Sequence, residues 1–380
     1  MEIKNLLKLI FDLTHEKRYP DIHLNTWSFP IIRNNNWELE RLENIEIVKK
    51  EFVNENWETI KETEKIEFNK LTKEEISQAI KIIAWTEWYE KFTKNFELDT
   101  SYKHENKDNY RVNCYIDTAW YSIALRIIPT KIPTIEDLWL GESIKELCQK
   151  EKWLILVTWP TWSWKSTNLA AMIDYINKNY KKHIITIEDP VEFVFESEKS
   201  LINQREIWNH TFSFNDAIRA SLREDPDIIM VWEMRDLETI KAAITLAETW
   251  HLVLSTLHTN DSVQSVDRII DSFPASQQDQ IRMQFAMSLI WIISQRLLPR
   301  SNWNWRIPAR EILISNDAVR NLIITWKTHQ LYSVIEVSSK SWMILMDKYL
   351  TLLYQKWVID KETLFSCARD REWIEMLINE

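Results

Sequence analysis

The sequence predicts an α/β protein with a mainly parallel β-sheet, preceded by a smaller α+β domain. In the longer C-terminal part, short apolar runs alternate with helical patterns, which is the order that a parallel sheet requires. These runs lie at 154–158, 183–187, 228–231 and 251–255. Nearer the N-terminus, strand-like runs follow one another with few helical patterns between them. We therefore expect an N-terminal domain over 1–128, a linker over 129–139 and a second domain over 140–380.

The N-terminal domain is expected to begin with an amphipathic helix that packs on the core, because apolar residues recur there at helical spacing. These residues are Ile3, Leu6, Leu7 and Ile10. A short strand is expected at 21–24. Residues 29–33 and 38–42 flank an Asn-Asn-Asn-Trp turn and predict a hairpin. Residues 43–70 are rich in Glu, Lys and Asn, and we expect them to form a solvated surface loop with one helix.

The rest of this domain is expected to be a long helix followed by three strands. Thr72 and Glu75 form a capping-box pattern at the start of a helix over 71–92. The strand-like runs lie at 96–102, 110–116 and 121–128. Arg111 and Arg126 stand on the last two runs. Two interpretations of these arginines stay open: they face solvent on the sheet, or they reach the phosphates of a nucleotide held by the second domain.

The second domain opens with the stretch LILVTWPTWSWKS at 154–166, which predicts a buried strand, a tight turn and the start of a helix. This is the layout of the phosphate-binding P-loop, G-x-x-x-x-G-K-[ST]. In that motif backbone N–H groups surround the phosphates, the lysine reaches the β- and γ-phosphates, and the hydroxyl binds Mg²⁺. The sequence therefore predicts binding of ATP and Mg²⁺ by Trp159, Pro160, Thr161, Trp162, Ser163, Trp164, Lys165, Ser166 and Thr167.

Tryptophan occupies the positions of this motif where glycine is expected. The chain has 21 Trp and 1 Gly; counting every Trp as Gly would give 22 of 380 residues, about 6%, close to average glycine usage. Trp250, Trp326 and Trp357 each follow a helical pattern, where a glycine cap is common. Four further tryptophans follow Asn in turn-like dipeptides. We hypothesise that the gene encodes glycine with UGA, which was translated as Trp. The alternative is a genuinely tryptophan-rich protein.

Carboxylates and a histidine follow the predicted parallel strands at the point where each strand ends. Glu188 follows 183–187. Glu233 and His258 follow the next two predicted strands. In such sheets ligands bind at the carboxyl ends of the strands. Glu233 is the best candidate to polarise the attacking water, and Glu188 is the second.

These groups also suggest a metal site and further catalytic roles. Ser166 is expected to hold Mg²⁺ together with Glu188 and Glu233, through water. His258 either senses the γ-phosphate or has only a structural role. A basic group that neutralises the transferred phosphate is also required, as an arginine finger within one subunit or between subunits. The candidates are Arg111, Arg126, Arg219, Arg223 and Arg235.

Four segments resemble the signatures of the type II/IV secretion ATPases. LREDPDIIMVWEMRD at 222–236 resembles the family signature, with Trp232 where the family has glycine. IEDP at 187–190 resembles its Asp box, and TLHTN at 256–260 resembles its His box. AVRNLI at 318–323 is similar to an element typical of the pilus-retraction members.

This resemblance implies a RecA-like ATPase domain preceded by a PAS-like domain. It also implies a homohexameric ring that hydrolyses ATP to retract type IV pili in twitching motility. The expected partner is the platform protein of the pilus in the inner membrane, and the expected location is the cytoplasm at the inner face of that membrane. Arg111 and Arg126 match the family's N-terminal arginines that reach ATP.

Composition limits the other functions of the chain. A net charge of −10 argues against a general nucleic-acid surface, and no apolar run approaches the 18 residues of a membrane span. Two alternatives to retraction remain. A pilus-assembly or secretion ATPase would carry a further N-terminal domain and a tetracysteine site, whereas this chain has three dispersed cysteines. A non-catalytic ring subunit gains weight only if the tryptophans of the loop are genuine.

Overall fold

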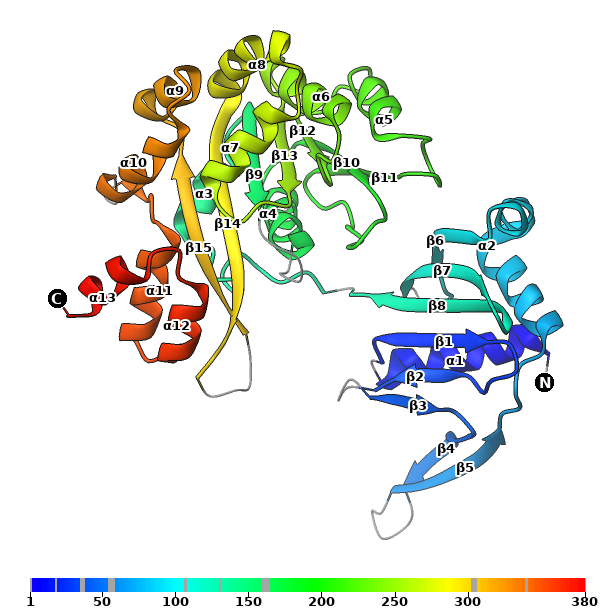
Figure 1. The fold of residues 1–380 in the computed structure, drawn as a ribbon. Coiled ribbons are helices and arrows are strands. Elements are labelled where there is room, and N and C mark those ends of the chain that lie inside the picture. The colour runs from blue at the N-terminus through cyan, green and yellow to red at the C-terminus, as the bar shows by residue number, and fades with distance from the viewer. Residues whose placement is uncertain are drawn as a thin grey trace. The chain divides into compact units, whose positions relative to one another are not determined.

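The computed structural model (Figure 1) describes residues 2–17, 19–34, 38–53, 59–105, 108–129, 131–158, 165–301, 306–338 and 341–379. The chain divides into two compact units, which are described separately. The N-terminal unit is Met1–Thr130 together with Pro190–Val194. The C-terminal unit is Lys131–Asp189 together with Phe195–Glu380.

The N-terminal unit is a six-stranded antiparallel sheet of order β3-β2-β1-β8-β7-β6, covered by two helices. The strands are β1 Asp21–Asn25, β2 Ile31–Arg33, β3 Leu39–Arg41, β6 Glu97–Lys103, β7 Asn109–Asp117 and β8 Trp120–Ile128. Helices α1 (Ile3–Lys17) and α2 (Lys73–Asn95) bury their apolar faces in the same cluster as the sheet. The predicted amphipathic helix and its four core residues are therefore confirmed. The capping box of Thr72 and Glu75 is also present at the start of α2.

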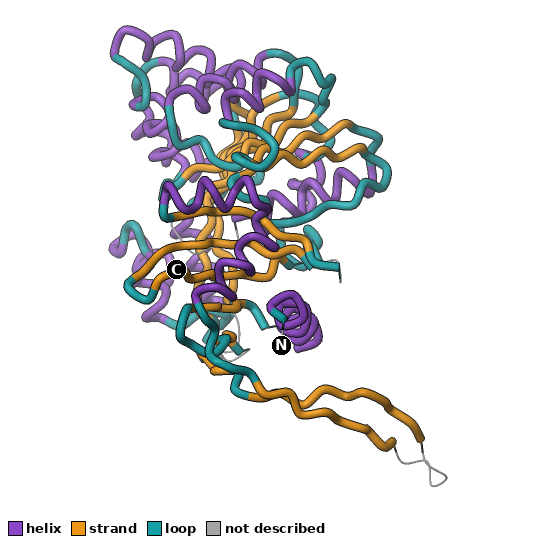
Figure 2. The backbone as a smooth tube through the Cα atoms, turned by 90° about the vertical axis from the view of Figure 1, so that its right-hand side faces the viewer, coloured by secondary structure: helices purple, strands orange, loops and turns teal. Residues whose placement is uncertain are grey.

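The expectation for residues 43–70 is wrong. They form a β-hairpin, β4 (Asn44–Val53) and β5 (Thr59–Glu67), in a sheet of its own, rather than a loop with a helix. Figure 2 shows the two strands running out side by side as a long ribbon. Apolar residues are spread among the charged ones, and the strand register places Ile45 opposite Ile66 and Phe52 opposite Ile60.

The C-terminal unit is built on a seven-stranded sheet of order β11-β10-β12-β13-β9-β14-β15. Every neighbouring pair is parallel except β14 and β15. The strands are β9 Trp153–Thr158, β10 His183–Glu188, β11 Leu201–Glu206, β12 Ile228–Val231, β13 Leu252–Leu257, β14 Leu289–Pro299 and β15 Arg306–Ile314. The predicted fold class, a mainly parallel sheet preceded by a smaller α+β unit, is confirmed. The four predicted parallel strands are present, and three further strands extend the sheet.

Helices cover both faces of this sheet, because its strands are apolar on both sides. On β9, Leu154 packs with the helices of one face, while Ile155 packs with α3 and α4 on the other. The first face carries α5 Phe214–Ser221, α6 Leu237–Glu248, α7 Ser262–Asp271, α8 Ala275–Ser288, α9 Asp317–Ile324 and α10 Leu331–Val337. The second carries α3 Glu142–Leu147 and α4 Lys165–Asn179. Three C-terminal helices form a separate small core with the ends of β14 and β15: α11 Met346–Gln355, α12 Lys361–Cys367 and α13 Arg371–Asn379.

The tryptophans hold unusual backbone conformations. Of the 14 whose backbone the structure describes, nine have φ between 56° and 107°. They are Trp27, Trp120, Trp139, Trp153, Trp208, Trp250, Trp326, Trp342 and Trp357. Only glycine adopts this left-handed region without steric cost. Eight of the nine side chains are more than half exposed, so packing does not explain the conformation.

Candidate active site

The predicted phosphate loop lies between a parallel strand and a helix. Strand β9 ends at Thr158 and α4 begins at Lys165. Trp159, Pro160, Thr161, Trp162, Ser163 and Trp164 lie outside the described residues, as do the side chains of Lys165 and Ser166. Thr167 is half-buried in the first turn of α4. The structure thus gives the frame of the motif, a buried strand that leads through six residues into a helix N-terminus.

Glu233 and His258, predicted to share one edge of the sheet, lie in contact. The Glu233 side chain is 8% exposed and lies between two basic groups. Nε of Arg235 lies 2.8 Å from its Oε2, and Nε2 of His258 lies 3.1 Å from its Oε1. The two segments meet because β12 and β13 are neighbouring parallel strands in register Val231–Ser255. A buried carboxylate beside the ends of parallel strands is suited to orient a water molecule.

Backbone hydrogen bonds fix the segment that carries Glu233. The N–H of Trp232 donates to the carbonyl of Ile187 at 2.9 Å, and the N–H of Met234 donates to the carbonyl of Thr256 at 3.1 Å. The Thr256 hydroxyl also donates to the carbonyl of Trp232. The segment after β12 is therefore held by the strands on either side, β10 and β13. These bonds fix the backbone of Glu233 because they are made by the residues directly before and after it.

Glu188, the second predicted acid, is buried at the end of β10 with 2% exposure. Its Oε1 accepts from Oγ1 of Thr186 at 2.6 Å and from Nε2 of Gln204 at 3.1 Å. Strand β10 lies directly beside β12, which puts Glu188 on the same edge of the sheet as Glu233.

A chain of buried hydroxyls joins the end of β9 to the loop that carries His258. Thr158 Oγ1 lies 2.8 Å from Oγ of Ser294, and Oγ of Ser265 donates to Thr158 Oγ1 at 3.4 Å. Ser265 Oγ also lies 2.6 Å from Oγ1 of Thr259, the neighbour of His258. Thr259 lies in the TLHTN segment singled out above, whereas Thr158, Ser265 and Ser294 were not among the predicted site residues.

The two arginines of the N-terminal unit face one another across β7 and β8, where Arg111 and Arg126 are register partners. Arg126 binds the buried carboxylate of Asp21 through Nε (2.6 Å to Oδ1) and a terminal nitrogen (3.2 Å to Oδ2). Arg33 Nε binds the same carboxylate at 3.2 Å. Hydrogen bonding to Asp21 raises the pKa of Arg126, and burial lowers the pKa of the neighbouring His23. All five residues line a cavity of about 450 Å³. Neither Asp21 nor Arg33 was among the predicted site residues.

The remaining arginine candidates have different surroundings. Arg235 is the partner of Glu233, as described above. Arg219, in α5, and Arg223, just after it, are exposed.

Among the described side chains, no group of three or more His, Cys, Asp or Glu residues is arranged to hold a metal ion. Nor does any helix in the described part of the chain have the length and apolar character needed to cross a membrane.

A strand–loop–helix frame for phosphate, with an acid and a histidine at the ends of neighbouring parallel strands, defines a P-loop nucleoside triphosphatase. Comparisons with known proteins narrow this class. Residues 123–321 match the family described as "Type II/IV secretion system protein". The chain belongs to this family and is one of its ATPases.

Similar proteins agree with this assignment. The chain is 44% identical to the "Twitching motility protein" of Neisseria gonorrhoeae over 281 residues, 74% of this chain and 75% of that protein. It is also 44% identical to the "Type IV pilus retractation ATPase PilT" of Pseudomonas aeruginosa over 271 residues, 71% and 78% of the two chains. The crystal structure of "the Pilus Retraction Motor PilT and Bound ADP" matches with a TM-score of 0.83 and 38% identity, covering 97% of this chain and 98% of that one. The resemblance inferred from the sequence motifs is thereby confirmed.

Proposed function

We propose that this chain is an ATP-hydrolysing motor that retracts type IV pili and so drives twitching motility. The similarity to two proteins named for these activities supports the proposal, as does the ADP-bound retraction motor of the same fold. The proposal includes a homohexameric ring in the cytoplasm, docked on the platform protein at the inner face of the membrane. The observation that carries it is the position of Glu233, between Arg235 and His258 on the edge where β9 leads to Lys165.

In this proposal Lys165 and the backbone of residues 159–164 hold the phosphates of ATP. The Ser166 hydroxyl, Glu188 and Glu233 are hard oxygen donors of the kind that Mg²⁺ takes together with phosphate oxygens and water. Bound Mg²⁺ would neutralise charge on the transferred phosphoryl group. Arg111 and Arg126 would reach the nucleotide from the N-terminal unit, and Asp21 would keep the Arg126 guanidinium in place.

Both carboxylate oxygens of Glu233 lie close to a basic side chain, so release of one of these side chains would leave more room for the attacking water. The Arg235 side chain is 63% exposed and that of His258 is 37% exposed. Arg235 can therefore leave at a lower cost, since its charge is already largely hydrated. We infer that Arg235 moves away when nucleotide binds and that His258 stays beside Glu233. Nucleotide binding would then shift the loop that carries His258.

Nucleotide binding requires glycine in the phosphate loop, because backbone N–H groups must approach the phosphates closely. We therefore propose that the native protein has glycine at Trp159, Trp162 and Trp164. The nine tryptophans with left-handed backbone support this, since the same substitution would remove strain at each of them. By contrast, Trp88 and Trp373 lie within helices and pack against apolar cores, so we expect tryptophan there.

Two experiments test the proposed function. Peptide mass spectrometry on protein from the native cell should find glycine at the loop positions and at the nine left-handed positions, and tryptophan at 88 and 373. UGG codons at the loop positions would contradict the decoding hypothesis. Deleting the gene should abolish twitching while surface pili persist or increase, because assembly continues without retraction. Loss of the pili themselves would instead indicate an assembly ATPase.

A further inference from the structure

A single buried carboxylate joins the starts of two helices in the C-terminal unit. Glu311, on β15, is 2% exposed. Its Oε1 accepts from the N–H of Ser262 at 2.8 Å, and its Oε2 accepts from the N–H of Met346 at 3.4 Å. Ser262 is the first residue of α7 and Met346 the first of α11. First-turn N–H groups have no partner within their helix and carry positive partial charge, so a carboxylate satisfies both ends at once.

The start of α7 is also bonded to the nucleotide edge of the sheet. Asp261 caps α7 by accepting from the N–H of Gln264 at 2.8 Å, and it stands three residues after His258. Ser265, in the same turn, belongs to the hydroxyl chain that reaches Thr158 at the end of β9. A shift of the loop after β13 therefore moves the helix end that Glu311 holds.

The start of α11, in turn, organises the C-terminal helices. Asp347, the second residue of α11, is 2% exposed. Its carboxylate accepts from the backbone N–H of Arg369 at 2.9 Å and of Asp370 at 2.8 Å. Both donors lie in the segment between α12 and α13. Movement of the first turn of α11 is thus passed directly to the following two helices.

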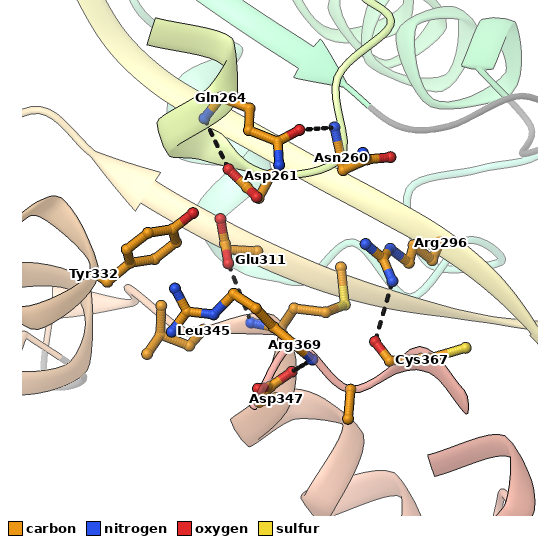
Figure 3. Close-up of a pocket in the computed structure, with 12 residues that line it drawn as sticks. Asn260, Asp261, Gln264, Arg296, Glu311, Tyr332, Leu345, Asp347, Cys367 and Arg369 are labelled. Atoms are coloured by element: carbon orange, nitrogen blue, oxygen red, sulfur yellow. Dashed lines mark hydrogen bonds between the residues drawn. The ribbon is translucent and has the colours of Figure 1, made fainter. Parts of the chain in front are cut away.

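A cavity of about 190 Å³ lies beside these contacts, lined by Asp261, Glu311, Tyr332, Asp347 and Arg369 among others. Figure 3 shows Glu311 between the Asp261 turn and the turn that carries Asp347. The Arg369 guanidinium stacks 3.7 Å from the centre of the Tyr332 ring, so a cation borders the cavity without forming an ion pair with Glu311 in the structure. A polar cavity of this size has room for several water molecules, which would let the two helix ends move without displacing core side chains.

We propose that Glu311 is a positioning residue that couples the His258 loop to helices α11 to α13. The proposal rests on the nucleotide-binding role proposed above for the edge of β9, β12 and β13. Glu311 transmits the state of that edge because it is the direct link, among the described residues, between the first turns of α7 and α11. A change at the bound nucleotide would thereby reach helices α11 to α13, which are distant in sequence from the segments that bind it.

The test is hydrogen exchange on the full-length chain carrying glycine at the proposed positions, with and without ADP. In the unchanged chain, ADP should alter exchange in residues 258–265 and also in residues 343–352. Glu311→Gln retains the shape of the side chain but has a single acceptor oxygen, so one helix end loses its partner. The variant should keep the response to ADP at 258–265 and lose it at 343–352. Glu362→Gln, on the exposed face of α12, is the matched control and should keep both responses.

Steady-state kinetics provides a second readout. We expect Glu311→Gln to lower kcat by about tenfold to a hundredfold while KM for ATP stays nearly unchanged, because helices α11 to α13 no longer follow the nucleotide edge during turnover. Failure of the unchanged chain to bind ADP would contradict the proposed function itself. Binding of ADP without a response at 343–352, or a full response in Glu311→Gln, would contradict the coupling alone. The comparison of the unchanged chain with and without ADP needs no variant, so it can contradict the coupling even if Glu311→Gln does not fold.

Discussion

Replacing Trp357 with glycine is expected to stabilise the C-terminal unit. Trp357 follows the C-cap of α11 with φ 58°. Its N–H donates to the carbonyl of Tyr354 at 2.8 Å, and the next N–H, of Val358, donates to the carbonyl of Leu353 at 2.9 Å. This pair of bonds is the Schellman motif, in which the left-handed position is usually glycine. The tryptophan side chain is 84% exposed, so the substitution removes little buried area.

The size of the effect follows from opposing terms. A non-glycine residue in the left-handed region costs roughly 1–2 kcal/mol. Glycine increases the conformational entropy of the unfolded chain, which offsets about 0.4–1 kcal/mol. The net gain is therefore on the order of 1 kcal/mol, which corresponds to a rise in Tm of about 2–4 °C for a unit of this size. Seven of the nine left-handed tryptophans lie in this unit. If distant sites add, glycine at all seven would stabilise the unit by about 7 kcal/mol, comparable to the whole stability of a domain.

The measurement must therefore be made in a chain that carries glycine at the other eight left-handed positions. Two versions, with tryptophan or glycine at 357, are compared by thermal unfolding of the purified protein. The control is Trp373→Gly, within α13, where the side chain packs against the core and the backbone is not left-handed. That change should lower Tm, because glycine weakens a helix and apolar contact is lost. An unchanged or lower Tm with glycine at 357 would refute the strain argument.

Three further predictions concern the site and the thiols. Glu233→Gln should retain binding of an ATP analogue but lower hydrolysis by about 10²-fold or more, measured by phosphate release, since the water loses its base; near-normal turnover would move that role to the second acid. Arg126→Ala should lower the free energy of unfolding of the N-terminal unit by about 1–3 kcal/mol in urea titrations, because Asp21 loses two hydrogen bonds, whereas Arg111→Ala should change it little. Burial raises the pKa of the Cys114 and Cys148 thiols to about 12. A thiol reagent at pH 8 should therefore modify Cys367 alone in the folded chain, and modification of all three thiols would show that the core is open.

Local patterns predicted most of the secondary structure, because the central strands are apolar on both faces and the main helices carry clear caps. Strand β11 was missed because most of its residues are exposed or partly exposed, and β14 was missed because it follows α8 without a turn residue. The hairpin over 43–70 was missed because its apolar residues are spread among charged ones. Pairing with neighbouring strands determines that these segments form strands, and composition does not reveal such pairing.

The meeting of Glu233 and His258 could be predicted, since the carboxyl ends of neighbouring parallel strands lie together. The partner of Arg126 could not. Asp21 lies opposite it only through the antiparallel register of β1 and β8, which joins segments 105 residues apart. Glu311 gave no signal either, because it lies within a strand that was not predicted and belongs to no motif. Both contacts join segments that are distant in sequence, and residue type alone does not bring such segments together.

ATP hydrolysis by matched chains tests the central claim most directly. The chains differ only at positions 159, 162 and 164, with glycine elsewhere at the left-handed positions, and Lys165→Ala in the glycine version is the inactive control. Only the glycine version should hydrolyse ATP, because indole side chains would fill the space that the phosphates need. Equal hydrolysis by the chain with Trp159, Trp162 and Trp164, or hydrolysis that survives Lys165→Ala, would contradict it.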